Sequence, residues 1–233
     1  NTKIYKKKIC KIILISLKNL FIISKNMNNK LTKLIKYYSL INHSLIFNNK
    51  SINRYNLVQP SIGKDKAQNL YKLREKIYNI ENCKLKENAS NIVFSDGNPN
   101  SKVMIIGEGP GANEDKEGFP FVGRAGQLLD KMLHAINLSR ENVYITNVVN
   151  YRPPDNRKPT EKEVARYLPY LKKHIEIIRP KIILLLGSTA MNAILPNKDV
   201  ISKVRGKWFE IEINDIKVNS IVSFHPAYLL RQP

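Results

Sequence analysis

Four short apolar runs, separated by segments with helical spacing, constrain the fold of this chain most strongly. They lie at residues 103–106, 143–146, 181–186 and 218–224. Short runs rich in Val, Ile and Leu are typical of strands buried on both faces of a parallel sheet. Strands that alternate with helices form such a sheet with helices on both faces. We therefore predict a three-layer α/β/α domain around a central, mostly parallel sheet of four strands.

The segments between these runs carry helix signals. Apolar residues recur with a helical period over residues 128–136. Thr160 and Glu163 form a capping box, which predicts a helix that runs towards Ile178. A further helix is expected from Ser188.

The charge of the chain is unevenly distributed. Residues 1–64 contain 13 Lys and Arg and no acid, whereas residues 65–233 contain 26 basic and 19 acidic residues, a net of +7 out of +20. We expect residues 1–64 to be a basic, low-complexity and partly disordered leader, and residues 65–233 to form the domain. Residues 1–26 are either a basic leader or upstream sequence ahead of a natural start at Met27, and we favour the second. The basic excess is compatible with a polyanionic partner but does not establish one.

The cysteines and the hydropathy indicate the compartment. The chain has two cysteines, Cys10 and Cys83, which lie far apart and do not make a disulfide framework, and this fits a reducing, cytoplasmic environment. The best apolar stretch, residues 12–23, is interrupted by Lys18 and Asn19, so we expect no membrane span.

Three unusual segments are expected as loops at the carboxyl ends of strands, where α/β sheets bind ligands: residues 107–121, 147–159 and 225–233. The first is rich in glycine but lacks the Gly-Lys-Ser/Thr of a phosphate-binding loop. Phe121 could stack on a base, although a lone Phe is more often core. Asn147 carries a donor and an acceptor that match the edge of uracil, or it caps its own loop. His225 is followed by Pro, two leucines and an arginine, which together offer a hydrogen-bond donor, a hydrophobic wedge and a phosphate contact.

These segments resemble motifs of the uracil-DNA glycosylase superfamily, especially its thermostable, iron–sulfur branch (family 4). The resemblance covers residues 73–233 and rests on Gly107-Glu-Gly-Pro-Gly111, Pro120-Phe-Val-Gly-Arg-Ala-Gly126, Asn147-Val-Val-Asn-Tyr-Arg-Pro-Pro-Asp-Asn-Arg157 and His225-Pro-Ala-Tyr-Leu-Leu-Arg231. It implies an enzyme that flips uracil out of DNA and hydrolyses its N-glycosidic bond, which starts base excision repair.

The resemblance also implies roles for single residues. The uracil-binding residues would be Glu108, Gly109, Phe121, Asn147 and His225. His225 would stabilise negative charge on the departing base. Because Gly109 stands where the best-known branch has its water-activating aspartate, Glu114 and Asn156 are expected to position water, and Glu114 also to exclude thymine. DNA would be contacted by Arg124, Leu229, Leu230 and Arg231.

Relatives in this branch hold a [4Fe–4S] cluster on four cysteines. The corresponding positions here are Ile80, Cys83, Tyr151 and Tyr167, of which one keeps its thiol. We therefore expect no cluster and no other cofactor or metal, with these side chains filling the volume by packing.

The expected partner is uracil-containing DNA, single- or double-stranded. The protein is expected to be a monomer associated with the bacterial nucleoid.

The main alternative is a degenerate, catalytically inactive DNA-binding member of the same superfamily. The branch that traps DNA covalently is disfavoured, because no Arg-rich insertion follows Arg152, and a nucleotide-binding regulator does not explain the His225–Arg231 segment. Relatives continue beyond the position of Pro233, so we expect a missing C-terminal segment.

Overall fold

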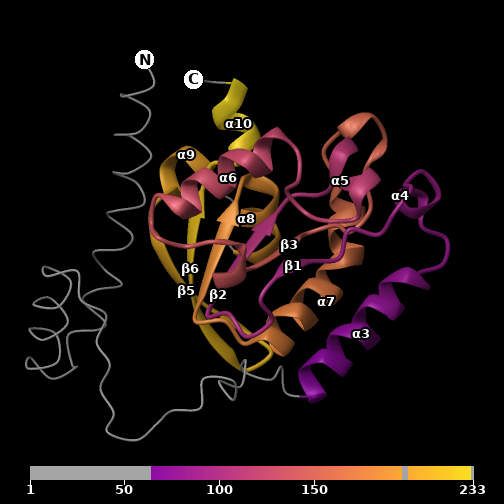
Figure 1. Ribbon diagram of the computed structural model, residues 1–233, viewed down its shortest axis with the longest axis horizontal. Helices are drawn as coiled ribbons and strands as arrows, with labels where there is room; N and C mark the ends of the chain where they lie inside the picture. The colour runs from indigo at the N-terminus through magenta and orange to yellow at the C-terminus, as the bar shows by residue number, and fades with distance from the viewer. Residues whose placement is uncertain (1–63, 196–198, 232–233) are drawn as a thin grey trace, which may run out of the picture.

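A six-stranded sheet with the order β1-β3-β2-β4-β6-β5 forms the centre of the fold (Figure 1). The computed structural model describes residues 64–195 and 199–231. The strands are β1 (Asp96–Gly97), β2 (Val103–Gly107), β3 (Tyr144–Asn147), β4 (Ile182–Leu186), β5 (Trp208–Ile213) and β6 (Ile216–Ser223). Strands β3, β2, β4 and β6 run parallel to their neighbours, whereas β1 and β5 are antiparallel strands at the two edges.

The four predicted strands are confirmed as the parallel centre of the sheet, but the predicted number of strands was too low. Strand β1 has two residues, too short to leave an apolar run in the sequence. Strand β5 pairs with β6 through Asn214 and Asp215, which both have positive φ, as the central residues of a type I′ hairpin turn do. The alternation Trp-Phe-Glu-Ile-Glu-Ile before Asn214 was the signal that could have predicted this hairpin.

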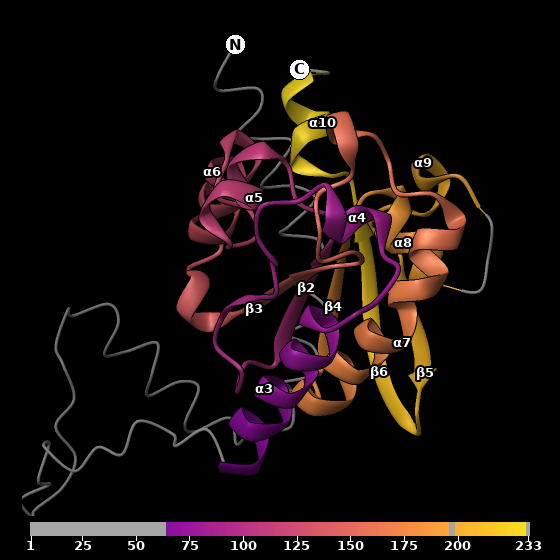
Figure 2. The same cartoon turned by 90° about the vertical axis from the view of Figure 1, so that its right-hand side faces the viewer.

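Helices cover both faces of the sheet, which confirms the three-layer architecture (Figure 2). The helices are α3 (Lys64–Tyr78), α4 (Lys84–Glu87), α5 (Ala112–Glu117), α6 (Arg124–His134), α7 (Glu161–Ile178), α8 (Ser188–Ile194), α9 (Ile201–Val204) and α10 (Pro226–Arg231). Alternate residues of the central strands enter two separate cores, as the period of a strand requires. Met104 and Ile106 pack with residues of α3, α7 and α8, whereas Ile105 packs with Leu129 and Leu133 of α6.

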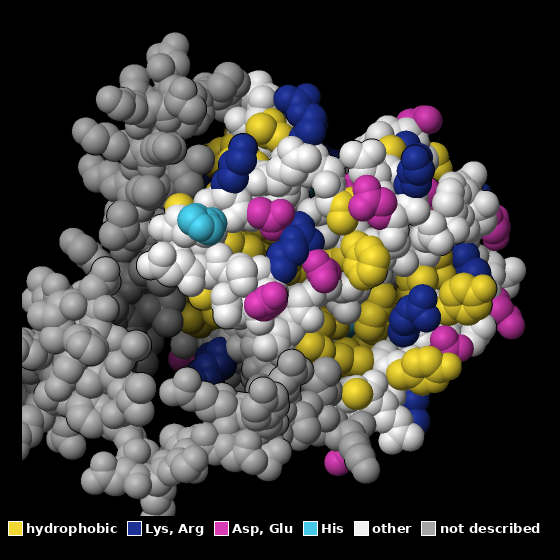
Figure 3. Space-filling model, in the orientation of Figure 1, with side chains coloured by type: hydrophobic (Ala, Val, Ile, Leu, Met, Phe, Trp, Pro, Cys, Tyr) yellow, Lys and Arg dark blue, Asp and Glu magenta, His cyan; other side chains and the backbone are white. Residues whose placement is uncertain are grey.

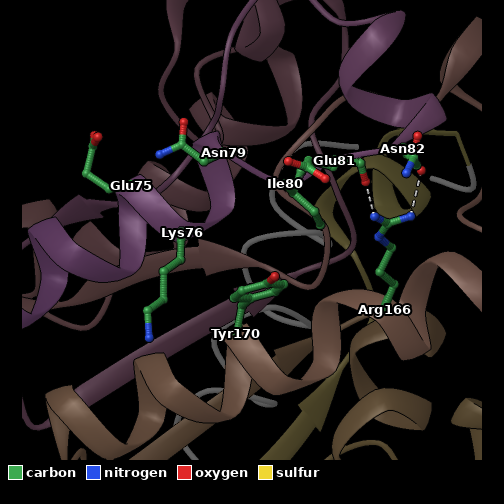
Figure 4. A pocket seen from close by; sticks show the side chains of 8 residues that line it. All are labelled: Glu75, Lys76, Asn79, Ile80, Glu81, Asn82, Arg166 and Tyr170. Atoms are coloured by element: carbon green, nitrogen blue, oxygen red, sulfur yellow. Dashed lines mark hydrogen bonds between the residues drawn. The ribbon is translucent and has the colours of Figure 1, made fainter.

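Helix α7 begins where the sequence predicts. The Thr160 hydroxyl accepts a hydrogen bond from the Glu163 amide at 3.2 Å, and Glu163 Oε2 accepts one from the Thr160 amide at 2.7 Å. Helix α3 packs against α7, and Arg166 of α7 donates to the backbone carbonyls of Glu81 and Asn82 just beyond α3 (Figure 4). The segment after α3 is thus fastened to α7.

Two of the three predicted loops contain α-helices, and the third, residues 147–159, contains the short 3-10 helix η4 (Pro154–Asn156). Residues 112–117 form α5, and the segment after His225 is α10 rather than a loop. Pro226 fits the first turn of a helix, because its ring fixes φ and its missing N–H has no partner to lose there. Leu229, Leu230 and Arg231 continue the helix because all three are good helix formers. The predicted leader lies outside the described residues except for Lys64, the first residue of α3.

Among the described residues, no helix is long and apolar enough to cross a membrane.

Candidate active site

A cleft of about 570 Å³ lies at the carboxyl ends of the parallel strands. It is lined by Gly109 after β2, Asn147 at the end of β3, Gly187 after β4, and Phe224 and His225 after β6. All residues predicted to bind uracil or to act in catalysis line this one cleft: Glu108, Gly109, Glu114, Phe121, Asn147, Asn156 and His225. The folded chain therefore brings together residues that are up to 117 positions apart in the sequence.

Asn147 and Phe121 meet across Gly107. A Cβ atom on Gly107 would lie 2.4 Å from Asn147 Oδ1 and 2.6 Å from the Phe121 ring, so only glycine fits between them. Asn147 is 3% exposed and lines the cleft. Its amide offers both a hydrogen-bond donor and an acceptor to a ligand in the cleft. This amide is thus suited to recognise a polar ligand.

Phe121 has a left-handed backbone conformation, with φ of 56°. Its carbonyl accepts a hydrogen bond from Arg140 Nη2, and the Pro120 carbonyl accepts one from Nη1 at 3.1 Å. Arg140 is itself held by Asp96 at 2.6 Å and by Asp130 at 2.8 Å. The charged network thus fixes the backbone that carries the aromatic ring.

His225 stacks on Phe121, with ring centroids 5.5 Å apart and an interplanar angle of 25°. Its Nδ1 accepts a hydrogen bond from the Ala227 amide at 3.2 Å, so in the neutral ring the proton is on Nε2. Burial lowers the pKa of His225 below its usual range; Arg231 also lowers it, and Glu108 and Glu114 oppose the shift. At neutral pH the ring is therefore neutral and can donate from Nε2.

The Glu114 side chain links the two turns that contain Gly111 and Gly123. Its carboxylate accepts hydrogen bonds from the Gly123 amide at 2.8 Å and from the Gly111 amide at 3.1 Å, which joins the start of α6 to the start of α5. Glu108 accepts a hydrogen bond from the Thr189 hydroxyl of α8. Asn156 is exposed at the rim, and its Oδ1 accepts from Arg152 Nε at 2.8 Å. The predicted role of Glu114 and Asn156 in positioning water stays a prediction.

The residues expected to contact DNA lie on α6 and α10, which pack against each other. Arg231 lines the cleft, whereas Arg124, Leu229 and Leu230 lie outside its lining. Leu230 is 40% exposed and Leu229 is half-buried. In Figure 3, Lys and Arg side chains flank an apolar surface at the end of the molecule where α10 lies.

Several cleft residues were not predicted. They are Ser188, Ile201, Ser202, Phe224 and Tyr228, together with Arg157 and Lys158. Phe224 directly precedes the predicted His225-Pro226 pair and Tyr228 follows it after Ala227, so their position could have suggested a role. Ile201 and Ser202 carry no such signal, because they reach the cleft only through the packing of α9.

The four positions that we expect to correspond to cluster cysteines lie in one core. Ile80, Cys83, Tyr151 and Tyr167 are all buried, and Cys83 Sγ lies 3.2 Å from the Tyr167 hydroxyl. Burial raises the pKa of Tyr151 to about 12 and that of Tyr167 further. Both phenols therefore stay protonated, and a single thiol is a poor match for a cluster held by four thiolates. Among the described residues, no group of three or more His, Cys, Asp or Glu side chains could hold a metal ion.

A buried amide, an aromatic face and a neutral imidazole at the end of a parallel sheet define a site for a flat, polar heterocycle. The sequence model described as "Uracil DNA glycosylase superfamily" matches residues 94–233, and the chain belongs to this superfamily. It is 46% identical over 158 residues to the type-4 uracil-DNA glycosylase of Thermotoga maritima, covering 67% of this chain and 81% of that one. It is 43% identical over 169 residues to the type-4 enzyme of Sulfurisphaera tokodaii, covering 70% and 77%. With the type-5 uracil-DNA glycosylase of Pyrobaculum aerophilum the identity is 31% over 149 residues, covering 57% and 64%.

Proposed function

We propose that this chain is a uracil-DNA glycosylase, a monofunctional hydrolase that cleaves the bond between uracil and deoxyribose in DNA. The observation that carries the proposal is the meeting of Asn147, Phe121 and His225 in one cleft. Membership of the superfamily supports it, as do the names of the type-4 relatives.

Asn147 reads the base in this proposal. The uracil edge offers an acceptor at O4 and a donor at N3, which an amide can satisfy with both of its groups. Cytosine has the opposite pattern and would leave buried groups unpaired, which costs about 1–3 kcal/mol for each group. The buried amide therefore discriminates between the two bases.

His225 stabilises the departing base. Cleavage leaves positive charge on the sugar and negative charge on uracil, and the Nε2–H of the neutral ring can donate to O2 as the charge develops. The hydrogen bond from Ala227 to Nδ1 orients the ring before the substrate binds. Glu114 and Asn156 are the proposed residues for placing the attacking water, with Glu114 also excluding the methyl group of thymine.

A base inside a duplex must leave the stack before it can enter such a cleft, at a cost of a few kcal/mol. Leu229 and Leu230 of α10 are proposed to fill the vacated space, with Arg231 and Arg124 on the phosphates. Single- or double-stranded uracil-DNA as substrate, a monomeric state and a reducing, cytoplasmic, nucleoid-associated location stay predictions.

We further propose that the protein works without an iron–sulfur cluster, because Ile80, Cys83, Tyr151 and Tyr167 do not provide a ligand set for one. Protein purified without oxygen should be colourless. Broad absorbance at roughly 400 nm, together with bound iron and sulfide, would contradict this proposal.

The activity is tested with a labelled oligonucleotide that carries one uracil, followed by alkali cleavage of abasic sites. The parent protein should cut the strand, and His225→Ala and Asn147→Ala should each lower the rate by at least about 100-fold, the usual scale for loss of one preorganised donor. The exposed His134 and Asn192 provide matched controls, and their Ala variants should behave like the parent.

A folded protein that binds DNA but never releases uracil would overturn the proposal and favour the inactive DNA-binding alternative. An equal effect of the His134→Ala control would show that the loss is not specific to the cleft.

A further inference from the structure

The cleft extends beyond the groups that would hold uracil. On the side of α9 and α10 it is lined by Ile201, Ser202, Phe224 and Tyr228. None of these is required to read the base or to cleave its bond in the proposed mechanism. This part of the cleft therefore has room for a second group of the substrate.

Its two aromatic side chains contact each other beside Arg205. The Arg205 guanidinium lies 4.8 Å from the centre of the Phe224 ring, and the Phe224 and Tyr228 rings lie 4.9 Å apart at an angle of 38°. Phe224 thus contacts both Arg205 and Tyr228. Tyr228 is 43% exposed, so its ring is open to contact by a further flat group.

The position of Tyr228 is fixed relative to His225. The Tyr228 amide donates to the His225 carbonyl at 2.9 Å, in the first turn of α10. Lys158 and Arg231 line the same cleft and supply positive charge for a phosphate backbone. An exposed aromatic ring beside basic side chains is the arrangement that proteins use to hold unpaired bases.

We propose that Tyr228, supported by Phe224 and Arg205, stacks on the base next to the flipped uracil in single-stranded DNA. This base is free to leave its neighbours in a single strand, whereas in a duplex it stays paired and stacked. Tyr228 is therefore a specificity-determining residue that favours unpaired substrate. The inference rests on the proposed function, because it takes the cleft to hold a flipped uracil.

The test compares Tyr228→Ala, Tyr228→Phe and the control Tyr71→Ala, an exposed tyrosine of α3, on single-stranded and duplex oligonucleotides with one uracil. Tyr228→Ala should lower kcat/KM on the single strand by roughly 5- to 100-fold, the range given by stacking of one base on an aromatic ring. It should change the duplex rate by less than about 3-fold. Tyr228→Phe and Tyr71→Ala should match the parent on both substrates. A single strand whose flanking bases are replaced by abasic spacers should show no effect of Tyr228→Ala.

A binding measurement keeps this inference separate from the proposed activity. In a single strand with 2-aminopurine beside the uracil, parent protein should quench the fluorescence and Tyr228→Ala should not. If the parent cleaves neither substrate, the proposed function fails while this quenching still decides the inference. Equal losses on single strand and duplex, or quenching that is unchanged in Tyr228→Ala, would overturn the inference.

Discussion

The left-handed backbone of Phe121 is the most demanding single-residue feature of the site. A bulky residue in this region costs of order 1–3 kcal/mol and persists only where the surroundings fix it. Here Arg140 holds the carbonyl, and Gly126 allows the close approach, since a Cβ atom there would lie 1.6 Å from the Phe121 oxygen. The aromatic face thus depends on residues that do not themselves line the cleft.

Replacing Arg140 with lysine should impair the site without unfolding the domain. A lysine keeps the charge but cannot bond Asp96, Asp130 and two carbonyls at once. We expect kcat/KM on uracil-DNA to fall by about 10- to 100-fold, the scale of a misplaced substrate-positioning group.

Because Arg140 acts through Phe121, the combination of Arg140→Lys with Phe121→Leu should lose little more than Phe121→Leu alone. Lys131→Ala, an exposed change on α6, is the control and should leave the rate unchanged. Additive losses in the double variant would contradict the positioning role.

At this scale, the sequence was enough to predict the site residues at the ends of strands. It was not enough to predict the residues that fix the position of the site, such as Arg140. Asn147 and His225 were predicted because polar residues at the ends of buried strands face a common edge. Arg140 reaches Asp96 over 44 positions, and no local pattern marks such a pair.

At the scale of elements, the contacts that join the α3 region to α7 include Cys83 and Tyr167, two of the positions proposed to correspond to cluster cysteines. Cys83 contacts the Tyr167 hydroxyl, and Arg166 binds the carbonyls of Glu81 and Asn82. Lys66 of α3 donates to the Ile178 carbonyl at the other end of α7, at 3.2 Å. Hydrogen bonds and packing thus join these helices along their length.

Arg166→Gln should weaken the attachment of the segment after α3 to α7, because it removes the hydrogen bonds to the Glu81 and Asn82 carbonyls. The side chain is exposed, so the expected loss of unfolding free energy is modest, about 1 kcal/mol. Hydrogen exchange measured by mass spectrometry should become faster in peptides that cover residues 71–83, while exchange in β2 and β4 stays the same. Lys172→Gln on α7 serves as the control, and equal changes in both variants would exclude a specific role for Arg166.

The elements that could be predicted were those with a strong local pattern. The parallel strands are continuous apolar runs, and the Thr160 cap is visible in four residues. The α10 helix was missed because the resemblance presented its residues as a loop motif, although Pro226 and the following leucines fit a helix.

At the scale of the whole molecule, the larger core contains an ionisable pair that links folding to pH. His174 is 1% exposed, and its Nδ1 lies 3.0 Å from the Tyr144 hydroxyl. Its Nε2 has no hydrogen-bond partner among the described residues. Burial lowers the pKa of His174 from 6.5 to about 3.

Stability should therefore fall in acid. The unfolded chain binds a proton at His174 below about pH 6.5 and the folded chain does not until about pH 3, so the stabilisation present above pH 6.5 is lost as the pH falls towards 3. The loss is on the order of several kcal/mol at the low end. His174→Gln cannot titrate, so its Tm should depend less on pH between 6.5 and 4 than the Tm of the parent. The exposed variant His134→Gln should behave like the parent, and equal slopes for all three proteins would refute the assignment.

The segment from Phe121 to Gly126 also limits how this protein can vary. Valine, isoleucine and threonine are strongly disfavoured at position 121 because of its φ, and any side chain at position 126 collides with the carbonyl of residue 121. Position 126 therefore cannot change without a change in the path of the backbone, whereas position 121 excludes chiefly the β-branched residues. Substitutions that change which base is bound are thus more readily tolerated at the strand ends and in α10 than at Phe121, the ring on which the base would rest.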